Sequence, residues 1–168
     1  MRDRKPVPYS VRHLGRDRIR QAFSLIQAVD PALSLEAWRR YARPRVETRC
    51  PGGMPRRGIL ALEDQRGCIL TLMEYHVETD LHDGRILRCT CLAAVDLLNP
   101  RAALRALVRG IRQCAEAMGC RAIHVTAPRS LGALTTALVD SGFGIDAAGH
   151  RLALRQDTAE TRAGLLHA

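Results

Sequence analysis

The second half of the chain alternates apolar strand-like segments with amphipathic helix-like segments, and no other feature constrains the fold as strongly. Residues 85–95 and 121–126 are short, mostly apolar runs of the kind found in buried strands. Residues 100–118 lie between them and repeat apolar side chains three and four positions apart, which predicts an amphipathic helix. A further helical segment follows residue 130 and leads to Ser141-Gly142-Phe143. This strand, helix, strand, helix order predicts an α/β fold.

Residues that commonly begin and end helices flank these two helical segments. Asn99 and Pro100 supply an N-cap and a proline at the first helical position, and Gly119 is the expected C-cap. Ser130 is expected to cap the last helix, which ends at Gly142. The side chains expected to face the core are Leu104, Leu107, Val108, Ile111, Ala115 and Met118 on the first helix, and Leu131, Leu134, Leu138 and Val139 on the second.

The first half of the chain predicts a short strand and two helices. Residues 9–14 alternate in polarity, and residues 19–29 carry a helical stripe of apolar side chains. Ser34 is expected to cap a second helix, which Pro44 is expected to stop because proline disfavours continued helix. Residues 43–57 are rich in proline and glycine and lack periodicity, which predicts a loop.

The remaining segments predict strands joined by tight turns. Three antiparallel strands are expected over residues 58–62, 68–77 and 85–95. Asp64-Gln65-Arg66-Gly67 and Asp83-Gly84 have the composition of the turns between them. Residues 143–155 predict a closing pair of strands that turns at Ala148-Gly149.

Length and composition favour one globular domain in the cytoplasm. A chain of 168 residues is long enough to bury a core without disulfides or metals. It contains no apolar run of about 18 residues, so no membrane span is expected. The charged start, residues 1–6, is not followed by an apolar segment, so no secretory signal is expected.

The six cysteines are expected to be reduced and structural. They form no CxxC pair and no zinc-finger spacing with histidine, so no metal site is expected. Cys89 and Cys91 share one face of a strand, where a thiol could act as an acyl-enzyme nucleophile. No neighbouring residue in the sequence would lower their pKa, so we interpret both as core residues.

The net charge of +9 comes almost entirely from arginine, because Lys5 is the only lysine. A basic surface attracts anions such as nucleic acid, acidic partners or a phosphorylated cofactor. Nucleic acid is not the expected partner, because the chain has no recognised binding motif and no basic stretch interleaved with aromatic residues. Four arginines form a stripe opposite the apolar face of the central helix: Arg101, Arg105, Arg109 and Arg112.

The order of these elements, with a helix beginning directly after a buried strand, resembles the GNAT superfamily of N-acetyltransferases. The family motif at that helix start is Q/R-x-x-G-x-G/A, and it matches here as Arg101-Ala102-Ala103-Leu104-Arg105-Ala106. Arg101 and Ala106 fit the motif, whereas Leu104 replaces its middle glycine. The resemblance implies that the pyrophosphate of acetyl-CoA or another acyl-CoA binds to the N–H groups of this first turn. Leu104 is expected to crowd that site.

The second hallmark of the family lies in the last helix, commonly N-x-x-A-x-x-L-Y-x-x-x-G-F. Gly142 and Phe143 match its end, but Leu131 stands at the asparagine position and Leu138 at the tyrosine position. In the family that tyrosine is the usual proton donor to the departing thiolate. Its absence implies another acid, a solvent proton, or lost activity.

Acyl transfer also needs donors for the thioester oxyanion and a base for the amine. The resemblance implies that the donors are backbone N–H groups of Leu92, Ala93 and Ala94. Glu74 and His76 are the best candidate bases, because residues two apart in a strand share a face, and Leu70 and Leu72 are expected on that face too.

Other polar residues are weaker candidates for the base. Glu78, Asp80 and Asp96 lie at strand ends and are alternatives to Glu74 and His76. All of these groups could instead lie on a solvated sheet face. His124 is expected to be a hydrogen-bonded core histidine.

These observations predict a single α/β domain over residues 1–155 with a GNAT-like twisted mixed sheet flanked by helices. Residues 156–168 are expected to form a tail, either disordered or a short helix. The expected function is acyl-CoA-dependent N-acyltransfer, acetylation in the first instance, to a small-molecule or peptide amine. The alternative is a catalytically lapsed module that binds an acyl-CoA or a protein partner. Homodimers are frequent in the resembled family, so a homodimer is a further expectation.

Overall fold

A seven-stranded mixed sheet organises the chain, with the strand order β1-β2-β3-β4-β5-β7-β6. The structure is a computed structural model that describes residues 9–47, 55–94, 100–127, 131–146 and 149–154. The strands are β1 (Tyr9–His13), β2 (Arg57–Asp64), β3 (Ile69–Asp80), β4 (Gly84–Ala94), β5 (Ala122–Thr126), β6 (Gly144–Asp146) and β7 (Gly149–Ala153). The helices are α1 (Ile19–Val29), α2 (Leu35–Val46), α3 (Pro100–Ala117) and α4 (Gly132–Asp140), with a 3-10 turn, η1 (Arg16–Arg18), before α1.

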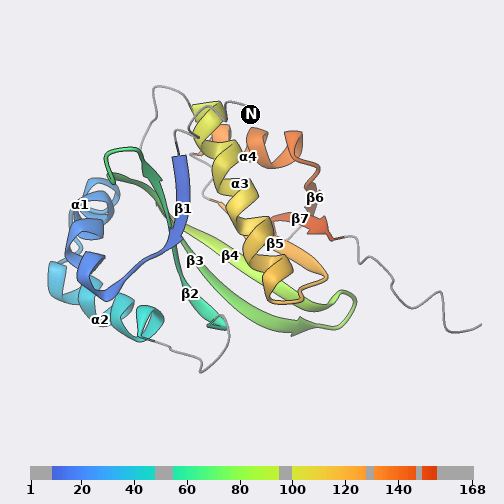
Figure 1. The fold of residues 1–168 in the computed structure, drawn as a ribbon, viewed down its shortest axis with the longest axis horizontal. Helices are drawn as coiled ribbons and strands as arrows, with labels where there is room; N and C mark the ends of the chain where they lie inside the picture. The colour runs from blue at the N-terminus through green and yellow to red at the C-terminus, as the bar shows by residue number, and fades with distance from the viewer. Residues whose placement is uncertain (1–8, 48–54, 95–99, 128–130, 147–148, 155–168) are drawn as a thin grey trace, which may run out of the picture.

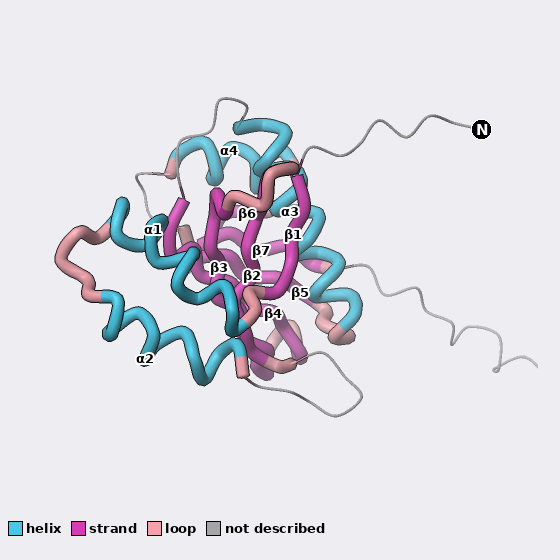
Figure 2. Tube along the Cα trace, turned by 60° about the vertical axis from the view of Figure 1, so that its left-hand side comes forward, coloured by secondary structure: helices cyan, strands magenta, loops and turns pink. Residues whose placement is uncertain are grey.

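The helices cover both faces of the sheet, as Figure 1 shows. Helices α1 and α2 pack on one face, around Trp38, Ile59 and Leu72. Helix α3 crosses the other face, where Leu107 and Ile111 are fully buried, and α4 joins it there. Figure 2 shows the same three layers from the side of α1 and α2. Burial of apolar side chains on both faces is what stabilises the central strands.

Strands β4 and β5 form the only parallel pair among the described strands. Their ladder runs from Ile86 opposite Ala122 to Thr90 opposite Thr126. Beyond Thr90, β4 continues to Ala94 and pairs only with β3 in the described structure. The ladder between the two strands therefore ends at Thr90 and Thr126, where β5 itself ends, and the last residues of β4 have no β5 partner.

A β-bulge lies in β4 just beyond its last rung with β5. Leu72 pairs with Ala93 and Met73 with Cys91, so Leu92 is the extra residue. Bulges of this kind locally re-aim side chains. Cys91 packs in the core beneath α3, whereas both Leu92 and Ala93 pack on the side of α1 and α2.

A second bulge corrects the expected face of Leu70. Leu62 pairs with Thr71 and Glu63 with Ile69, so Leu70 is the extra residue of β3. Leu70 consequently packs against the α3 side of the sheet, while Leu72 packs against α1 and α2. The expectation that Leu70 shares the face of Leu72 and Glu74 was wrong, because a bulge shifts the alternation by one residue.

The two ends of α2 agree only in part with the sequence-based expectation. The Ser34 side chain caps α2 by accepting a hydrogen bond from the Ala37 N–H at 3.1 Å. Helix α2 does not stop at Pro44 as expected but continues to Val46. Pro44 lies in the last turn, where the loss of one backbone donor disturbs little of the helix that precedes it.

The two later helices also follow the sequence in part. Gly119 ends the α3 segment in the left-handed conformation, with φ of 65°, as expected of a C-cap glycine. In α4 the buried positions Leu134 and Leu138 are confirmed, but Val139 is 44% exposed rather than buried. The expected caps Asn99 and Ser130 lie outside the described residues, as do Ala148 and the predicted tail.

Candidate functional site

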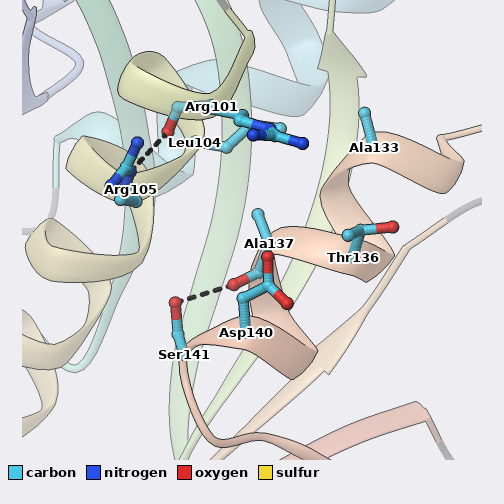
Figure 3. A pocket seen from close by; sticks show the side chains of 8 residues that line it. All are labelled: Arg101, Leu104, Arg105, Ala133, Thr136, Ala137, Asp140 and Ser141. Atoms are coloured by element: carbon cyan, nitrogen blue, oxygen red, sulfur yellow. Dashed lines mark hydrogen bonds between the residues drawn. The ribbon is translucent and has the colours of Figure 1, made fainter.

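A cavity of about 480 Å³ lies between the start of α3 and the length of α4. Arg101 and Arg105 approach it from α3, and Arg101 extends towards α4 in Figure 3. The lining residues are Arg101, Leu104, Arg105, Ala133, Thr136, Ala137, Asp140 and Ser141. Arg101 is the second residue of α3, so the cavity adjoins the helix N-terminus.

The electrostatics of this cavity suit an anion. Arg101 and Arg105 are both exposed, and the Arg105 Nε donates to the Arg101 carbonyl at 3.2 Å. The first turn of a helix adds a partial positive charge and N–H groups without intrahelical acceptors. Asp140 is the one acidic residue among the described lining residues. Two guanidinium groups beside a helix N-terminus fit the phosphate groups of a nucleotide-type cofactor.

The other residues of the expected motif lie differently. Ala103 and Ala106 are buried against the sheet and, like Ala102, do not line the cavity. Leu104 lines the cavity but is only 7% exposed and belongs to the core beneath α3. Most of the Leu104 side chain therefore packs inward.

The four arginines of α3 do not form a uniform solvated stripe. Arg101, Arg105 and Arg109 are exposed, but Arg112 is half-buried and donates to the Ser141 carbonyl at the end of α4. Arg112 thus joins α3 to the C-terminus of α4, where a cation is favourable.

The position that carries the family tyrosine is closed to solvent. Leu138 is fully buried in the core, so neither its side chain nor its location offers a proton donor. Leu131 immediately precedes α4 and makes no side-chain cap. The position of the family tyrosine therefore supplies no proton donor here.

A second cavity, of about 570 Å³, lies between α1, α2 and the β4 bulge. We refer to it as the α1–α2 cavity. Its described lining residues are Ile26, Val29, Asp30, Leu33, Ala37, Trp38, Arg40, Tyr41 and Leu92. Leu92 is the bulge residue, so the cavity reaches the part of β4 just beyond the last rung of the β4–β5 ladder.

Glu74 lies beside this cavity and is held by two donors from α2. The Tyr41 hydroxyl donates to the Glu74 carboxylate, and the Arg45 Nε lies 2.5 Å from its Oε1. Arg45 also stacks over the Tyr41 ring, with its guanidinium carbon 3.6 Å from the ring centroid. Burial, together with the hydrogen bond to Glu74, raises the pKa of Tyr41 to about 12. Tyr41 therefore remains a protonated donor at neutral pH.

Glu74 also lies beside the last rung of the β4–β5 ladder. It pairs across strands with Thr90, which in turn pairs with Thr126 at the last rung of the β4–β5 ladder. Residues directly opposite each other in neighbouring strands share a face of the sheet. The sequence alone did not identify Tyr41 or Thr90 as site residues. Tyr41 follows Trp38 by one helical turn, a spacing that placed it on the buried face of α2 but gave no partner.

His76 belongs to a separate polar network. Its Nε2 lies 3.1 Å from the Glu78 carboxylate, which also binds Arg88. The hydrogen bond from Arg88 lowers the pKa of Glu78. The structure therefore does not bring His76 and Glu74 together through a hydrogen bond. Asp80 accepts backbone hydrogen bonds in the β3–β4 turn, and Asp96 lies outside the described residues.

His124 is hydrogen-bonded and mostly buried, as expected. Its Nε2 lies 3.3 Å from Asp83, and its side chain is 13% exposed. Arg151 donates to the same carboxylate from β7 at 2.6 Å. The hydrogen bond from Arg151 lowers the pKa of Asp83 to about 2. This trio joins the β3–β4 turn to β5 and β7.

Among the described cysteines four are buried, as expected of core residues, whereas Cys68 is exposed. Cys89 and Cys91 are buried, and the described residues contain no cluster of side chains that could hold a metal. Burial raises the pKa of Cys91 to about 11, although a hydrogen bond from the Ala93 N–H opposes this shift.

Solved acetyltransferase structures resemble this chain. Glucosamine-6-phosphate N-acetyltransferase from Arabidopsis thaliana has a TM-score of 0.59 at 15% identity, covering 88% of this chain and 97% of that chain. A GNAT-family acetyltransferase from Streptococcus pneumoniae has a TM-score of 0.58 at 12% identity, covering 82% and 86%. Spermidine N-acetyltransferase from Vibrio cholerae, solved with CoA and spermine, has a TM-score of 0.57 at 11% identity, covering 86% and 92%.

The sequence itself matches no protein-family model and no curated protein, so the similarity is carried by the structure. The described part of the chain holds no helix that is both long and apolar enough to cross a membrane. The mixed sheet, its flanking helices and the structural neighbours show that the chain has the fold of the GNAT N-acetyltransferases.

Proposed function

We propose that the protein is an acyl-CoA-dependent N-acyltransferase of the cytoplasm that acts on a small-molecule or peptide amine. One observation carries the proposal: the β4–β5 ladder ends at Thr90 and Thr126 while β4 runs on to Ala94, and the arginine-lined cavity lies at the start of the helix that follows β4. The end of β4 that has no β5 partner therefore precedes a site for phosphate groups. An acyl-CoA, acetyl-CoA in the first instance, would supply the acyl group as a thioester.

The residues of the chain divide into three roles in this proposal. Arg101 and Arg105 bind phosphate groups at the N-terminus of α3. Backbone N–H groups of the bulge, at Leu92, Ala93 and Ala94, stabilise the developing oxyanion.

Glu74 is the proposed general base, with Tyr41 as its positioning partner. A carboxylate offers about four lone-pair sites, and Tyr41 and Arg45 occupy only part of them. The remaining sites can accept a proton from the amine, directly or through one water. His76 is the second choice, because it bonds to Glu78 rather than to Glu74.

A catalytically lapsed module that binds an acyl-CoA or a protein is the second candidate. It is favoured by Leu138, which is fully buried where the family carries its acid.

Acyl-CoA binding and amine-dependent release of CoA separate these candidates. If acetyl-CoA binds, a concentration of a hundred dissociation constants stabilises the fold by about 2.7 kcal/mol. For a chain of this size that is a melting shift on the order of 5–10 °C. Release of free CoA over a panel of amines then supports the transferase. Binding without release supports the lapsed module, and no shift with millimolar acetyl-CoA or longer acyl-CoAs rejects both.

A further inference from the structure

We infer that the amine acceptor is a primary monoamine carried on an apolar body, and that this body binds in the α1–α2 cavity. The inference rests on the proposed function, because it identifies the substrate class of the same site. It is drawn from the lining of the cavity, its charge balance and its position relative to the β4 bulge.

The lining of the α1–α2 cavity is mainly apolar. Ile26 and Trp38 form buried walls, at 7% and 2% exposure, and Val29 stands at 54% exposure on α1. The Trp38 and Tyr41 rings are stacked, with centroids 5.9 Å apart. A cavity of about 570 Å³ with this lining falls within the range of about 300–1,000 Å³ that is usual for small-molecule sites. Such a surface binds an aromatic or branched aliphatic group by removing it from water.

The charges around the cavity disfavour a polycation. Asp30 and Arg40 are the two charged residues among its described lining, and they have opposite signs. The neighbouring Glu74 is already balanced by Arg45. A polyamine would need several unpaired carboxylates, and the net charge of +9 adds further repulsion. An amine with one positive charge and an apolar body does not need several carboxylates, and it is repelled less by the basic protein.

The cavity also opens towards the proposed chemistry. Leu92 contributes to its wall and is the residue that bulges where β4 leaves β5. Tyr41 contributes to the same wall and bonds to Glu74, the proposed base. An apolar body held among Ile26, Leu33 and Trp38 would thus leave its amino group between the base and the thioester.

Trp38 provides a direct test of binding, because it is the only tryptophan of the chain and lines the cavity. We expect 2-phenylethylamine to change its fluorescence saturably, and spermidine and glucosamine-6-phosphate to leave it unchanged at the same concentrations. Turnover with acetyl-CoA should follow the same order, with kcat/KM at least about tenfold higher for 2-phenylethylamine than for spermidine.

A matched pair of variants locates the effect. Leu33→Asp places a charge on a half-buried wall of the cavity and should raise the dissociation constant of 2-phenylethylamine about tenfold or more, since an ionised carboxylate resists desolvation. Leu81 lies in the β3–β4 turn at 91% exposure, outside the cavity, so Leu81→Asp should leave the dissociation constant of 2-phenylethylamine unchanged. Val29→Asp is the second cavity variant; at an exposed position it should weaken the amine without unfolding the protein.

The outcomes separate this inference from the proposed function. Faster acetylation of spermidine or glucosamine-6-phosphate than of 2-phenylethylamine overturns the inference and leaves the transferase standing. Saturable binding of 2-phenylethylamine that Leu33→Asp weakens, without CoA release from any amine, supports the cavity as an amine site and rejects catalysis. A Trp38 response to octanoyl-CoA but not to 2-phenylethylamine assigns the cavity to the acyl chain and overturns the inference.

Discussion

Tyr41 on α2 donates a hydrogen bond from its hydroxyl to the Glu74 carboxylate on β3, and this contact ties the helix to the sheet. The contact spans 33 residues of sequence. It also fixes where Glu74 points, because Arg45 binds the same carboxylate one turn further along α2. The pair therefore places the proposed base in a defined orientation towards the α1–α2 cavity.

Glu74→Gln tests this base directly. We expect turnover to fall about a hundredfold, because a general base contributes on the order of 10²–10⁴ in rate. Acetyl-CoA affinity should stay nearly unchanged, since Glu74 does not line the cavity at the start of α3. Measurement of kcat together with the acetyl-CoA dissociation constant checks both.

Tyr41→Phe is the matched control for that substitution. It removes the hydroxyl but keeps the carboxylate, so we expect a smaller loss of turnover than in Glu74→Gln. A Glu74→Gln variant with wild-type turnover would remove Glu74 from the site, and His76 would become the next residue to test.

The cysteines give a prediction about reactivity. Burial raises the pKa of Cys91 to about 11 and that of Cys114 to about 12, so both thiols stay protonated at neutral pH. The thiolate is the reactive form, and Cys68 is exposed. Under native conditions at pH 7.5, iodoacetamide should therefore modify Cys68 and spare Cys91 and Cys114, as read by peptide mass spectrometry. Rapid modification of Cys91 would instead indicate a reactive thiol at the bulge.

Gly110 on α3 gives a prediction about packing. A Cβ at this position would lie 2.5 Å from the Val11 Cβ on β1, so the helix approaches the strand only because the side chain is absent. Gly110→Ala should destabilise the fold by about 1–3 kcal/mol despite the better helix propensity of alanine. Urea denaturation measures the change.

Two further variants show whether this clash is the cause. Val11→Gly combined with Gly110→Ala removes the Val11 Cβ and should therefore be less unstable than the sum of the two single changes, because the two residues are in contact. Gly132→Ala at the start of α4 meets no atom within 4 Å and should be neutral or slightly stabilising. If Gly110→Ala is as harmless as Gly132→Ala, α3 does not lie so close to β1.

The alternation of apolar strands and helices was sufficient to predict the order of elements, and the resemblance to the GNAT superfamily implied the mixed, helix-flanked sheet. The core face of α3 was also confirmed, because a helix of 18 residues has a clear period. The two bulges, at Leu70 and Leu92, were not predictable, since each is defined by the strand opposite. One of them reversed the expected face of Leu70.

The site was predicted less completely than the fold. The motif register placed Arg101 and Arg105 at the cavity, because their position in the first turn of α3 is local information. The Tyr41–Glu74 contact required knowledge of how α2 lies on the sheet. Leu104 was expected to crowd the phosphate site. Leu104 is 7% exposed, so its replacement by glycine should lower the free energy of unfolding by about 2–5 kcal/mol. Leu104→Gly is therefore a poor probe of binding.

Asp83 gives a prediction about pH. Its pKa falls from 3.8 to about 2 in the folded state, first because Arg151 donates to it. A lowered carboxyl pKa adds stability that is present above the unfolded value and is lost as the pH falls through the folded value. Asp83→Asn should therefore lower the urea midpoint at pH 5.5 and have much less effect at pH 2. Measurement of the urea midpoint of both proteins at pH 5.5 and pH 2 checks this.

Arg101→Ala and Arg105→Ala test the phosphate site against Arg109→Ala on the same helix. All three residues are exposed, but only Arg101 and Arg105 line the cavity at the start of α3. A charged hydrogen bond contributes about 1.5–3 kcal/mol, and about 1.4 kcal/mol is tenfold in affinity. Each cavity variant should therefore raise the acetyl-CoA dissociation constant about tenfold or more, as measured by calorimetry. Arg109→Ala should change the acetyl-CoA dissociation constant little, because the Arg109 charge of the wild type lies two turns beyond the helix start. Equal losses in all three variants would mean that only the general basic charge of α3 attracts the ligand and that its phosphates do not bind at this helix N-terminus.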